Sequence, residues 1–378
     1  MGACNQWNNE FNPFQKFKVL CWFNRMEQIP SGNFAPPVNV AFDLCQGTRD
    51  KKLCAGVRCN FCMSDLEDRG QEARVPPEIL MQVPAFYRQW GVKSVCLAGH
   101  HSDPFVYNHE HLSQFLRLMY RNDVEVGINT NGVVMTEFLK QEVTRNCKWT
   151  GFSVNAGTAK THALITNTKD AVFDVFDRIV QNIAEMNEYC RRFKIRHPTC
   201  FKFLITDDNY GEILDAIRLA REIGCRQIQI RPTELPECRS SKIDVTIVEQ
   251  QIAEGLAKWE IPHSFEIFGI REKFTADLKK KRPRRCIATP LGSTWKADGD
   301  IVICPDRRWS AHQDKMVLGN YINEGLEAIR RKWGGPQHRE MIEEANRRLG
   351  ECIRCTAYQW HELYENTVAD DVMDLRLI

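Results

Sequence analysis

Six short runs of β-forming residues alternate with helical patterns between residues 38 and 268, and this alternation limits the possible folds more than any other feature. The first run, 38–44, follows Pro36 and Pro37, which would stop a helix. The other runs are 92–97, 124–129, 149–154, 199–205 and 226–231, and the helical patterns are 77–90, 109–121, 136–145, 169–194 and 211–223. We therefore expect an α/β fold with a parallel sheet, a partial (β/α)6 TIM-like barrel with about three quarters of the usual eight units.

A doubly wound open sheet would show the same alternation. No Gly-x-Gly-x-x-Gly pattern follows the first run, however, so nothing specific favours a dinucleotide-binding fold. In a parallel barrel the chemistry lies on the loops that follow the strands. Here these loops are rich in cysteine, glycine and short polar side chains, and they cover residues 53–62, 98–104, 130–132, 153–158 and 232–234. Each alone is ordinary turn chemistry, but five at one edge predict a functional site.

Cysteine is over-represented, with 16 residues in a chain of 378. The N-terminus carries neither the basic nor the apolar region of an export signal, and no run of 18 apolar residues occurs, so we expect a cytoplasmic protein with no membrane partner. In a reducing compartment, clustered cysteines favour metal or cluster ligation over disulfides. Two groups have ligand spacing: Cys54, Cys59 and Cys62 near the start, and Cys286, Cys304, Cys352 and Cys355 near the end. The single cysteines inside apolar stretches are expected to act as small hydrophobic residues.

The first group follows the first predicted strand and closely resembles the cluster loop of the radical S-adenosylmethionine (SAM) superfamily. In that family three cysteines hold a [4Fe-4S] cluster, whose open iron binds the amino and carboxylate groups of SAM. The spacing here is C-x4-C-x2-C, where the family usually has C-x3-C-x2-C. Cys45 is the alternative first ligand, but Cys54 closes a shorter loop and is preferred. A structural zinc knuckle is the alternative for the whole group.

The resemblance extends to the later loops. The stretch from His101 to Pro104 stands where the family has Gly-Gly-Glu-Pro, which contacts the methionine amine, although His101 and Ser102 add two side chains there. Thr130-Asn131-Gly132 matches a family Thr-Asn-Gly, and residues 202–209 and 228–232 resemble the strands that border the adenine. Across the chain, the resemblance implies cofactor contacts from Phe61, His101, Ser102, Asp103, Asn129, Asn131, Ser153, Asn155 and Arg231.

The second cysteine group resembles the SPASM or Twitch auxiliary domains that follow radical SAM barrels. A hairpin with an Asp298-Gly299 turn leads to Cys304, a Leu-Gly-Asn segment follows at 318–320, and Cys352 and Cys355 form a C-x2-C pair. Four thiolates would complete one auxiliary [4Fe-4S] cluster with no open iron. A zinc site with four cysteines is the alternative. The expected division is an N-terminal segment at 1–37 that packs on the barrel, the barrel at 38–268, and a small α+β cluster-binding domain at 269–378.

The implied chemistry is reductive cleavage of SAM to a 5′-deoxyadenosyl radical, which abstracts hydrogen from a peptide or small-molecule substrate and leads to oxidation, epimerisation or rearrangement. Such an enzyme needs an electron donor such as flavodoxin or ferredoxin. Cys238, in the loop after the sixth strand, is a candidate hydrogen-atom donor to the substrate radical.

Two other functions stay open. The run 279–285 has six Lys or Arg in seven residues, whereas the chain as a whole, with 51 basic and 49 acidic residues, carries a formal charge of only +2. We interpret the run as a solvated linker, but it could hold a phosphate or an acidic peptide, or a nucleotide or nucleic acid that the enzyme modifies. The alternative of another class is a non-enzymatic zinc protein that binds nucleic acid.

Overall fold

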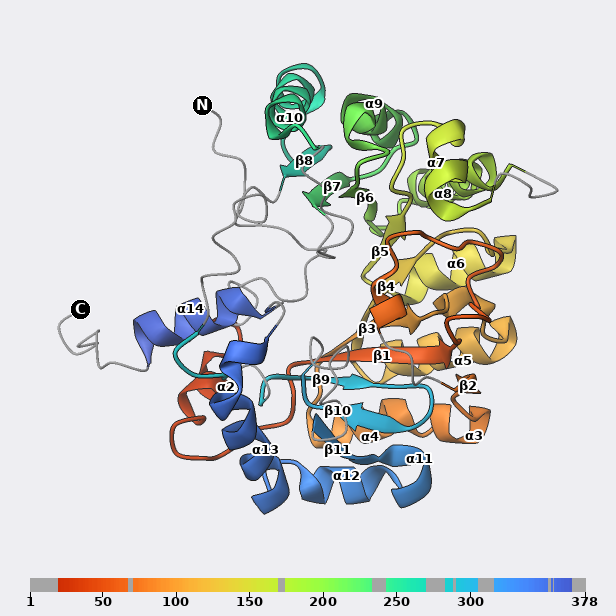
Figure 1. The fold of residues 1–378 in the computed structure, drawn as a ribbon. Helices are drawn as coiled ribbons and strands as arrows, with labels where there is room; N and C mark the ends of the chain where they lie inside the picture. The colour runs from red at the N-terminus through yellow and green to blue at the C-terminus, as the bar shows by residue number, and fades with distance from the viewer. Residues whose placement is uncertain are drawn as a thin grey trace.

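The computed structural model describes residues 20–66, 71–168, 174–232, 243–269, 283–287, 290–304, 316–352, 355 and 357–368. Its centre is one sheet in the order β11-β10-β9-β1-β3-β4-β5-β6-β7-β8 (Figure 1). The barrel strands are β1 (Asn39–Gln46), β3 (Ser94–His100), β4 (Glu125–Thr130), β5 (Trp149–Ser153), β6 (Thr199–Ile205), β7 (Gln227–Pro232) and β8 (Glu266–Gly269). They pair parallel throughout, and the sheet stays open, which confirms the predicted partial barrel.

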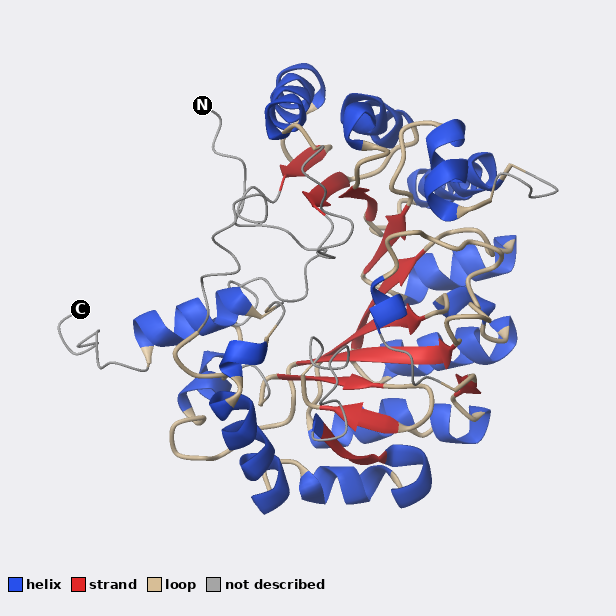
Figure 2. Ribbon diagram, in the orientation of Figure 1, coloured by secondary structure: helices blue, strands red, loops and turns tan. Residues whose placement is uncertain are grey.

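Helices cover the outer face of this curved sheet (Figure 2). They are α3 (Pro77–Leu80), α4 (Val83–Trp90), α5 (His109–Arg121), α6 (Glu137–Asn146), α7 (Ala159–Thr166), α8 (Val175–Phe193), α9 (Ile213–Glu222) and α10 (Val245–Trp259). Side chains alternate between the two faces of the sheet along β6. Phe201 and Phe203 point to the outer face and belong to the core beneath the helices. Cys200 instead packs with Cys96 and Trp149 on the concave face.

The helical pattern at 77–90 forms two helices, because Pro84 lies in the first turn of α4 and lacks the N–H that a continuous helix would use. α7, α10 and β8 were not predicted. Residues 169–173, the start of the predicted helix 169–194, lie outside the described residues. Within the described part of the chain, no helix has both the length and the apolar character needed to cross a membrane.

The C-terminal segment continues the barrel sheet. β9 (Gly292–Trp295) pairs parallel with β1, and β10 (Asp300–Val302) and β11 (Val317–Asn320) follow in antiparallel order. The predicted Asp298-Gly299 turn is confirmed: Gly299 has φ +97°, and a Cβ there would lie 2.4 Å from the Asn320 side chain. Four helices complete the segment, α11 (Tyr321–Glu324), α12 (Leu326–Lys332), α13 (Pro336–Arg347) and α14 (Tyr358–Thr367).

Aromatic packing fixes this continuation onto the barrel. The Trp295 ring lies 5.1 Å from Tyr87 of α4 and 4.9 Å from Tyr321 of α11, measured between centroids. The short helix α2 (Phe23–Glu27) is held by Arg25, which donates to the main-chain oxygens of Pro36 (2.7 Å) and Gly91 (2.8 Å). Strands from residues 292–320 therefore belong to the same sheet as the barrel strands and join it beside β1, and the domain boundaries stay predictions.

Candidate functional site

The loop that carries Cys54, Cys59 and Cys62 follows the carboxyl end of β1 and is held by the loop after β3. The N–H of Leu53 donates to the oxygen of His101 (2.6 Å), and the N–H of Asp103 donates to the oxygen of Leu53 (2.9 Å). These two bonds form a short parallel bridge between the two loops. The cysteine loop is thus fixed to the carboxyl edge of the sheet, where the sequence predicts the site.

Helix α7 anchors the middle of the same loop. The N–H groups of Arg58 and Asn60 donate to the oxygens of Thr166 (2.8 Å) and Ile165 (2.9 Å), at the last turn of α7. Asn167, in the left-handed conformation after that turn, donates back to the oxygen of Arg58 at 2.9 Å. Since the last carbonyls of a helix have no partner within it, the cysteine loop caps α7 while α7 fixes the loop.

The three thiols of the loop influence one another. Burial raises the pKa of Cys54 far above its usual value, and the nearby thiols of Cys59 and Cys62 raise it further. Burial and Cys62 raise the pKa of Cys59 to about 12. Each thiolate of the loop would therefore disfavour ionisation of the other thiols. A bound cationic centre would instead stabilise the three thiolates and lower their pKa values. The arrangement suits a group that needs three thiolates.

Cys45 has different surroundings. It lies buried in β1, its pKa is raised to about 11 by burial, and its charged neighbours are Arg74, Asp103 and Asp43. The Arg74 guanidinium lies 3.6 Å from its sulfur. The loop thiols are not among the groups that shift its pKa, so these surroundings favour Cys54 as the first ligand.

Asp103, for which the resemblance implies an amine contact, uses its carboxylate inside the protein. It is buried and accepts hydrogen bonds from the hydroxyl of Thr130 (2.9 Å), the N–H of Asn131 (2.6 Å) and the N–H of Phe105 (2.9 Å). Burial raises its pKa, while these bonds act in the opposite direction. Asp103 thus joins the loops after β3 and β4.

His101 and Asp65 form a charged group beside Cys62. The Nε2 of buried His101 lies 2.9 Å from Asp65, which also pairs with Lys52 at 2.8 Å. Among the described residues, Cys62, Asp65 and His101 are the one set of three whose ligand atoms all lie within 4.8 Å of each other. Lys52 and Asp65 were missed from the sequence, because single charged residues in a loop carry no spacing signal.

Some of the other residues with predicted cofactor contacts have solvent-accessible side chains, and the rest bond to or pack against other residues of the protein. Ser153 is exposed at the end of β5, and Arg231 is half-buried near the end of β7. Asn155, at φ +61°, is buried and accepts from the N–H of Leu204 at 2.9 Å. The internally bonded or packed set also includes Ser102, which donates to the oxygen of Cys45 (2.5 Å), Asn129, which donates to the Cys96 sulfur (3.2 Å), and Phe61, which is buried in the core. Cys238 lies outside the described residues.

The second cysteine group lies at the opposite end of β1. The N–H of Cys286 donates to Asn346 of α13 at 2.6 Å, and Cys355 contacts the apolar cluster that contains Trp360 of α14. Cys352 follows directly after α13 and a 3₁₀ turn (Leu349–Glu351). Cys304 comes two residues after the end of β10, which pairs with β9.

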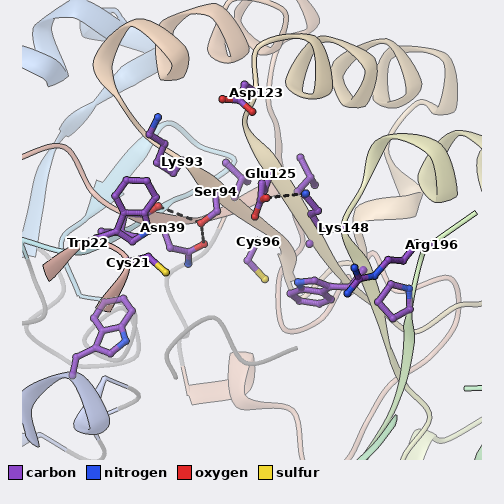
Figure 3. A pocket seen from close by; sticks show the side chains of 17 residues that line it. Cys21, Trp22, Asn39, Lys93, Ser94, Cys96, Asp123, Glu125, Lys148 and Arg196 are labelled. Carbon is purple, nitrogen blue, oxygen red and sulfur yellow. Dashed lines mark hydrogen bonds and ion pairs between the residues drawn. The ribbon is translucent and has the colours of Figure 1, made fainter. Parts of the chain in front are cut away.

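A cavity of about 670 Å³ opens at the amino-terminal edge of the sheet (Figure 3). Its wall combines aromatic rings with charged side chains, including Trp22, Lys93, Cys96, Glu125, Lys148, Trp149, Arg196 and Trp360. Lys148 and Glu125 form an ion pair of 2.9 Å. None of the described residues with predicted cofactor contacts lines this cavity, so it is distinct from the cysteine loop.

Comparison with known proteins finds a family match for part of the chain and a likeness in fold for most of it. Residues 56–190 match the radical SAM superfamily, while no curated protein matches the chain. The structure of Streptococcus suis SuiB bound to S-adenosylmethionine is similar over 97% of this chain and 84% of that one, with 13% identity and a TM-score of 0.62. Native anSMEcpe with bound AdoMet and the Cp18Cys peptide is similar over 89% of this chain and 91% of that one, with 14% identity and a TM-score of 0.57. These two likenesses show the fold.

Over residues 56–190 the chain is similar to the radical SAM superfamily, and the solved structures named above share its fold. Enzymes of this superfamily use a [4Fe-4S] cluster and SAM. The residues present fit such a cluster, because three mutually close thiols in one fixed loop are the donor set that leaves one iron open for SAM.

Proposed function

We propose that this chain uses SAM to abstract hydrogen from a peptide or small-molecule substrate, leading to its oxidation, epimerisation or rearrangement. The observation that carries the proposal is the loop with Cys54, Cys59 and Cys62, fixed between α7 and the loop after β3 within the matched segment. When bound there, the cluster and SAM supply a 5′-deoxyadenosyl radical after one-electron reduction. An electron donor such as flavodoxin or ferredoxin is part of the proposal.

The chain's own residues hold and shield the reactants. Among the predicted polar contacts, Ser153 and Arg231 have side chains that make no hydrogen bond or ion pair with the described residues, so they are our candidates for SAM or substrate contact. Asp103 and Asn131 act as positioning residues, since their polar groups join the loops around the cluster. The direct amine contact that the resemblance implies for Asp103 stays a prediction.

An auxiliary [4Fe-4S] cluster on Cys286, Cys304, Cys352 and Cys355 is the second part of the proposal. The bond from the N–H of Cys286 to Asn346 of α13, the helix that precedes Cys352, supports it. A zinc site with four cysteines is the alternative, and metal analysis distinguishes the two.

A peptide substrate is favoured over a nucleic acid. Both structures discussed above are of proteins studied with peptides, since SuiB is also known bound to the precursor peptide SuiA. Most of the basic run 279–285, on which the nucleotide or nucleic-acid alternative depends, lies outside the described residues. The proposed domain division at 37/38 and 268/269 and the donor role of Cys238 are further parts of this hypothesis.

The test is reductive cleavage of SAM by anaerobically purified protein with dithionite, followed as 5′-deoxyadenosine. The wild-type protein should be brown and active, and Cys59→Ala and Cys62→Ala should abolish cleavage while the fold persists. A colourless wild-type protein with stoichiometric zinc and no cleavage would overturn the proposal and favour the non-enzymatic zinc protein.

A further inference from the structure

Two basic side chains lie on neighbouring strands of the concave face. Lys202 of β6 is level with Gln229 of β7, and Leu204 is level with Arg231, so Lys202 and Arg231 share one face two residues apart. Both are half-buried. Two cations therefore project from adjacent strands into the space that the open barrel encloses.

Neither cation has an acidic partner in the described part of the chain. The Lys202 ammonium donates to the side-chain oxygen of Asn129 and stands 5.5 Å from the centre of the Trp149 ring. Arg231 makes no hydrogen bond or ion pair with the residues that the structure describes. Burial lowers the pKa of both groups, and Lys202 and Arg231 also repel each other. A desolvated cation without a counter-charge costs free energy that the fold alone does not recover.

Lys202 is held in place on this face. A Cβ at Gly151 would lie 2.4 Å from its Cε, so the bare glycine of β5 makes room for the lysine chain. The Lys202 ammonium reaches toward Trp149, at the start of β5, and therefore away from the cysteine loop at the carboxyl edge. Trp149 also lines the cavity at the amino-terminal edge, so the Lys202 ammonium stands beside one of the cavity walls.

We propose that Lys202 and Arg231 bind a carboxylate of the substrate, whose less polar part occupies the cavity beside Trp149. This inference rests on the proposed function and adds a substrate class, a peptide or small acid with a free carboxylate. The guanidinium offers a planar fork for two carboxylate oxygens, and the ammonium offers a point charge from the next strand. An anion between them would supply the missing counter-charge.

The test compares a matched pair of probes, N-acetyl-L-leucine and its neutral amide N-acetyl-L-leucinamide, by calorimetry on the full iron-loaded chain. The wild-type protein should bind the acid about tenfold more tightly than the amide. Lys202→Met and Arg231→Met should each reduce this preference to about twofold or less, and Lys202→Arg should keep most of it. Lys258→Met, which removes an exposed cation on α10 that does not line the cavity, is the control and should leave the preference unchanged.

Equal binding of acid and amide by the wild-type protein would overturn the proposal. So would a preserved preference in Lys202→Met and Arg231→Met, each shown to be folded by circular dichroism. SAM binding is measured on the same samples: its loss with intact acid preference would assign the cations to the cofactor carboxylate and also overturn the proposal. Failure of the wild-type protein to cleave SAM, with acid preference intact, would refute the proposed function and leave the anion site standing.

Discussion

The side-chain amide of Asn131 donates a hydrogen bond to the main-chain oxygen of Cys54 at 3.0 Å. On its other side, Asn131 accepts from the N–H of Val133, and its own N–H donates to Asp103. One residue after β4 therefore fixes the first cysteine of the loop after β1. This relationship gives a physical role to the Thr-Asn-Gly turn that the sequence alone identifies only by resemblance.

Asn131→Ala should weaken the hold on the proposed cluster without unfolding the chain. One lost hydrogen bond is worth about 1 kcal/mol, which corresponds to roughly fivefold in an equilibrium. We therefore expect iron to leave about fivefold faster when a chelator is added, measured by the bleaching of absorbance near 400 nm. Asn122→Ala removes a similar bond, to the Leu118 oxygen at the end of α5, and should leave the rate unchanged. Equal rates in both variants would contradict the anchoring role.

Cys54→Ala and Cys45→Ala distinguish the first ligand. Cys54 is electrostatically coupled to Cys59 and Cys62, and Cys45 is not, so only Cys54→Ala should lower the iron content, from about eight to about four per chain. Iron analysis of the two purified variants is the measurement. A loss of iron in Cys45→Ala and not in Cys54→Ala would show that Cys45 is the first ligand and that the cluster loop is longer.

The periodicity of the sequence was enough to predict the parallel barrel. The runs at 149–154 and 199–205 became β5 and β6 nearly as drawn, because their alternating apolar residues have one helix-covered face to fill. α7 was missed, since residues 159–166 lack a strong amphipathic pattern. The helix is instead stabilised by tertiary contacts, through the cysteine loop at its end and through Glu212, which accepts from Thr158 and Thr161 at its start.

The site was predicted at the level of loops and less well at the level of side chains. Spacing and resemblance brought His101 and Asp103 to the correct edge, but they could not show that Asp103 would bond to Thr130 and Asn131. Lys202 was not singled out, because a lone lysine in a strand gives no signal until the described neighbouring strands are seen to carry no acidic partner for it. Such information depends on contacts between strands that are distant in sequence.

Cys286→Ala and Cys352→Ala should each remove the proposed auxiliary cluster. The two residues lie on segments joined by the bond from Cys286 to Asn346, so iron content and thermal stability should fall together. SAM cleavage should persist in part, because Cys54, Cys59 and Cys62 are untouched. Metal analysis that finds about one zinc and about four irons in the wild-type chain would refute the auxiliary cluster and favour a zinc site.

His197 should make the fold sensitive to acid. Its Nδ1 lies 3.0 Å from the Cys147 oxygen and donates to it, so its Nε2 accepts from the Thr150 hydroxyl at 3.0 Å. Burial lowers its pKa from the usual 6.5 to about 4. Between these values the unfolded chain binds the proton and the folded chain does not, so stability is full above pH 6.5 and decreases as the pH falls toward 4.

His197→Gln should therefore unfold at a lower temperature than wild type at pH 7.5, yet lose less further stability at pH 5. Thermal unfolding at the two pH values measures this. Buried His162 and His361 have pKa values lowered to about 4 by the same cause, so part of the acid sensitivity should persist. His111→Gln, at the first turn of α5, is the control. An unchanged difference between pH 7.5 and pH 5 in His197→Gln would rule out this histidine as a source.

Asp65→Asn should raise the reduction potential of the cluster proposed on the first loop. The Asp65 carboxylate lies within 4.8 Å of the Cys62 sulfur and contacts both Lys52 and His101. Reduction adds an electron to the cluster, and a nearby negative charge opposes it, so replacing the carboxylate by an amide of similar shape makes reduction easier. A redox titration followed by electron paramagnetic resonance, at fixed pH and without SAM, gives the midpoint potential directly.

The control is Glu188→Gln, which removes a carboxylate from an exposed ion pair on α8 and should not change the midpoint potential. A midpoint that is unchanged or lower in Asp65→Asn would show that this carboxylate does not act on the cluster and would leave it a purely structural contact of His101.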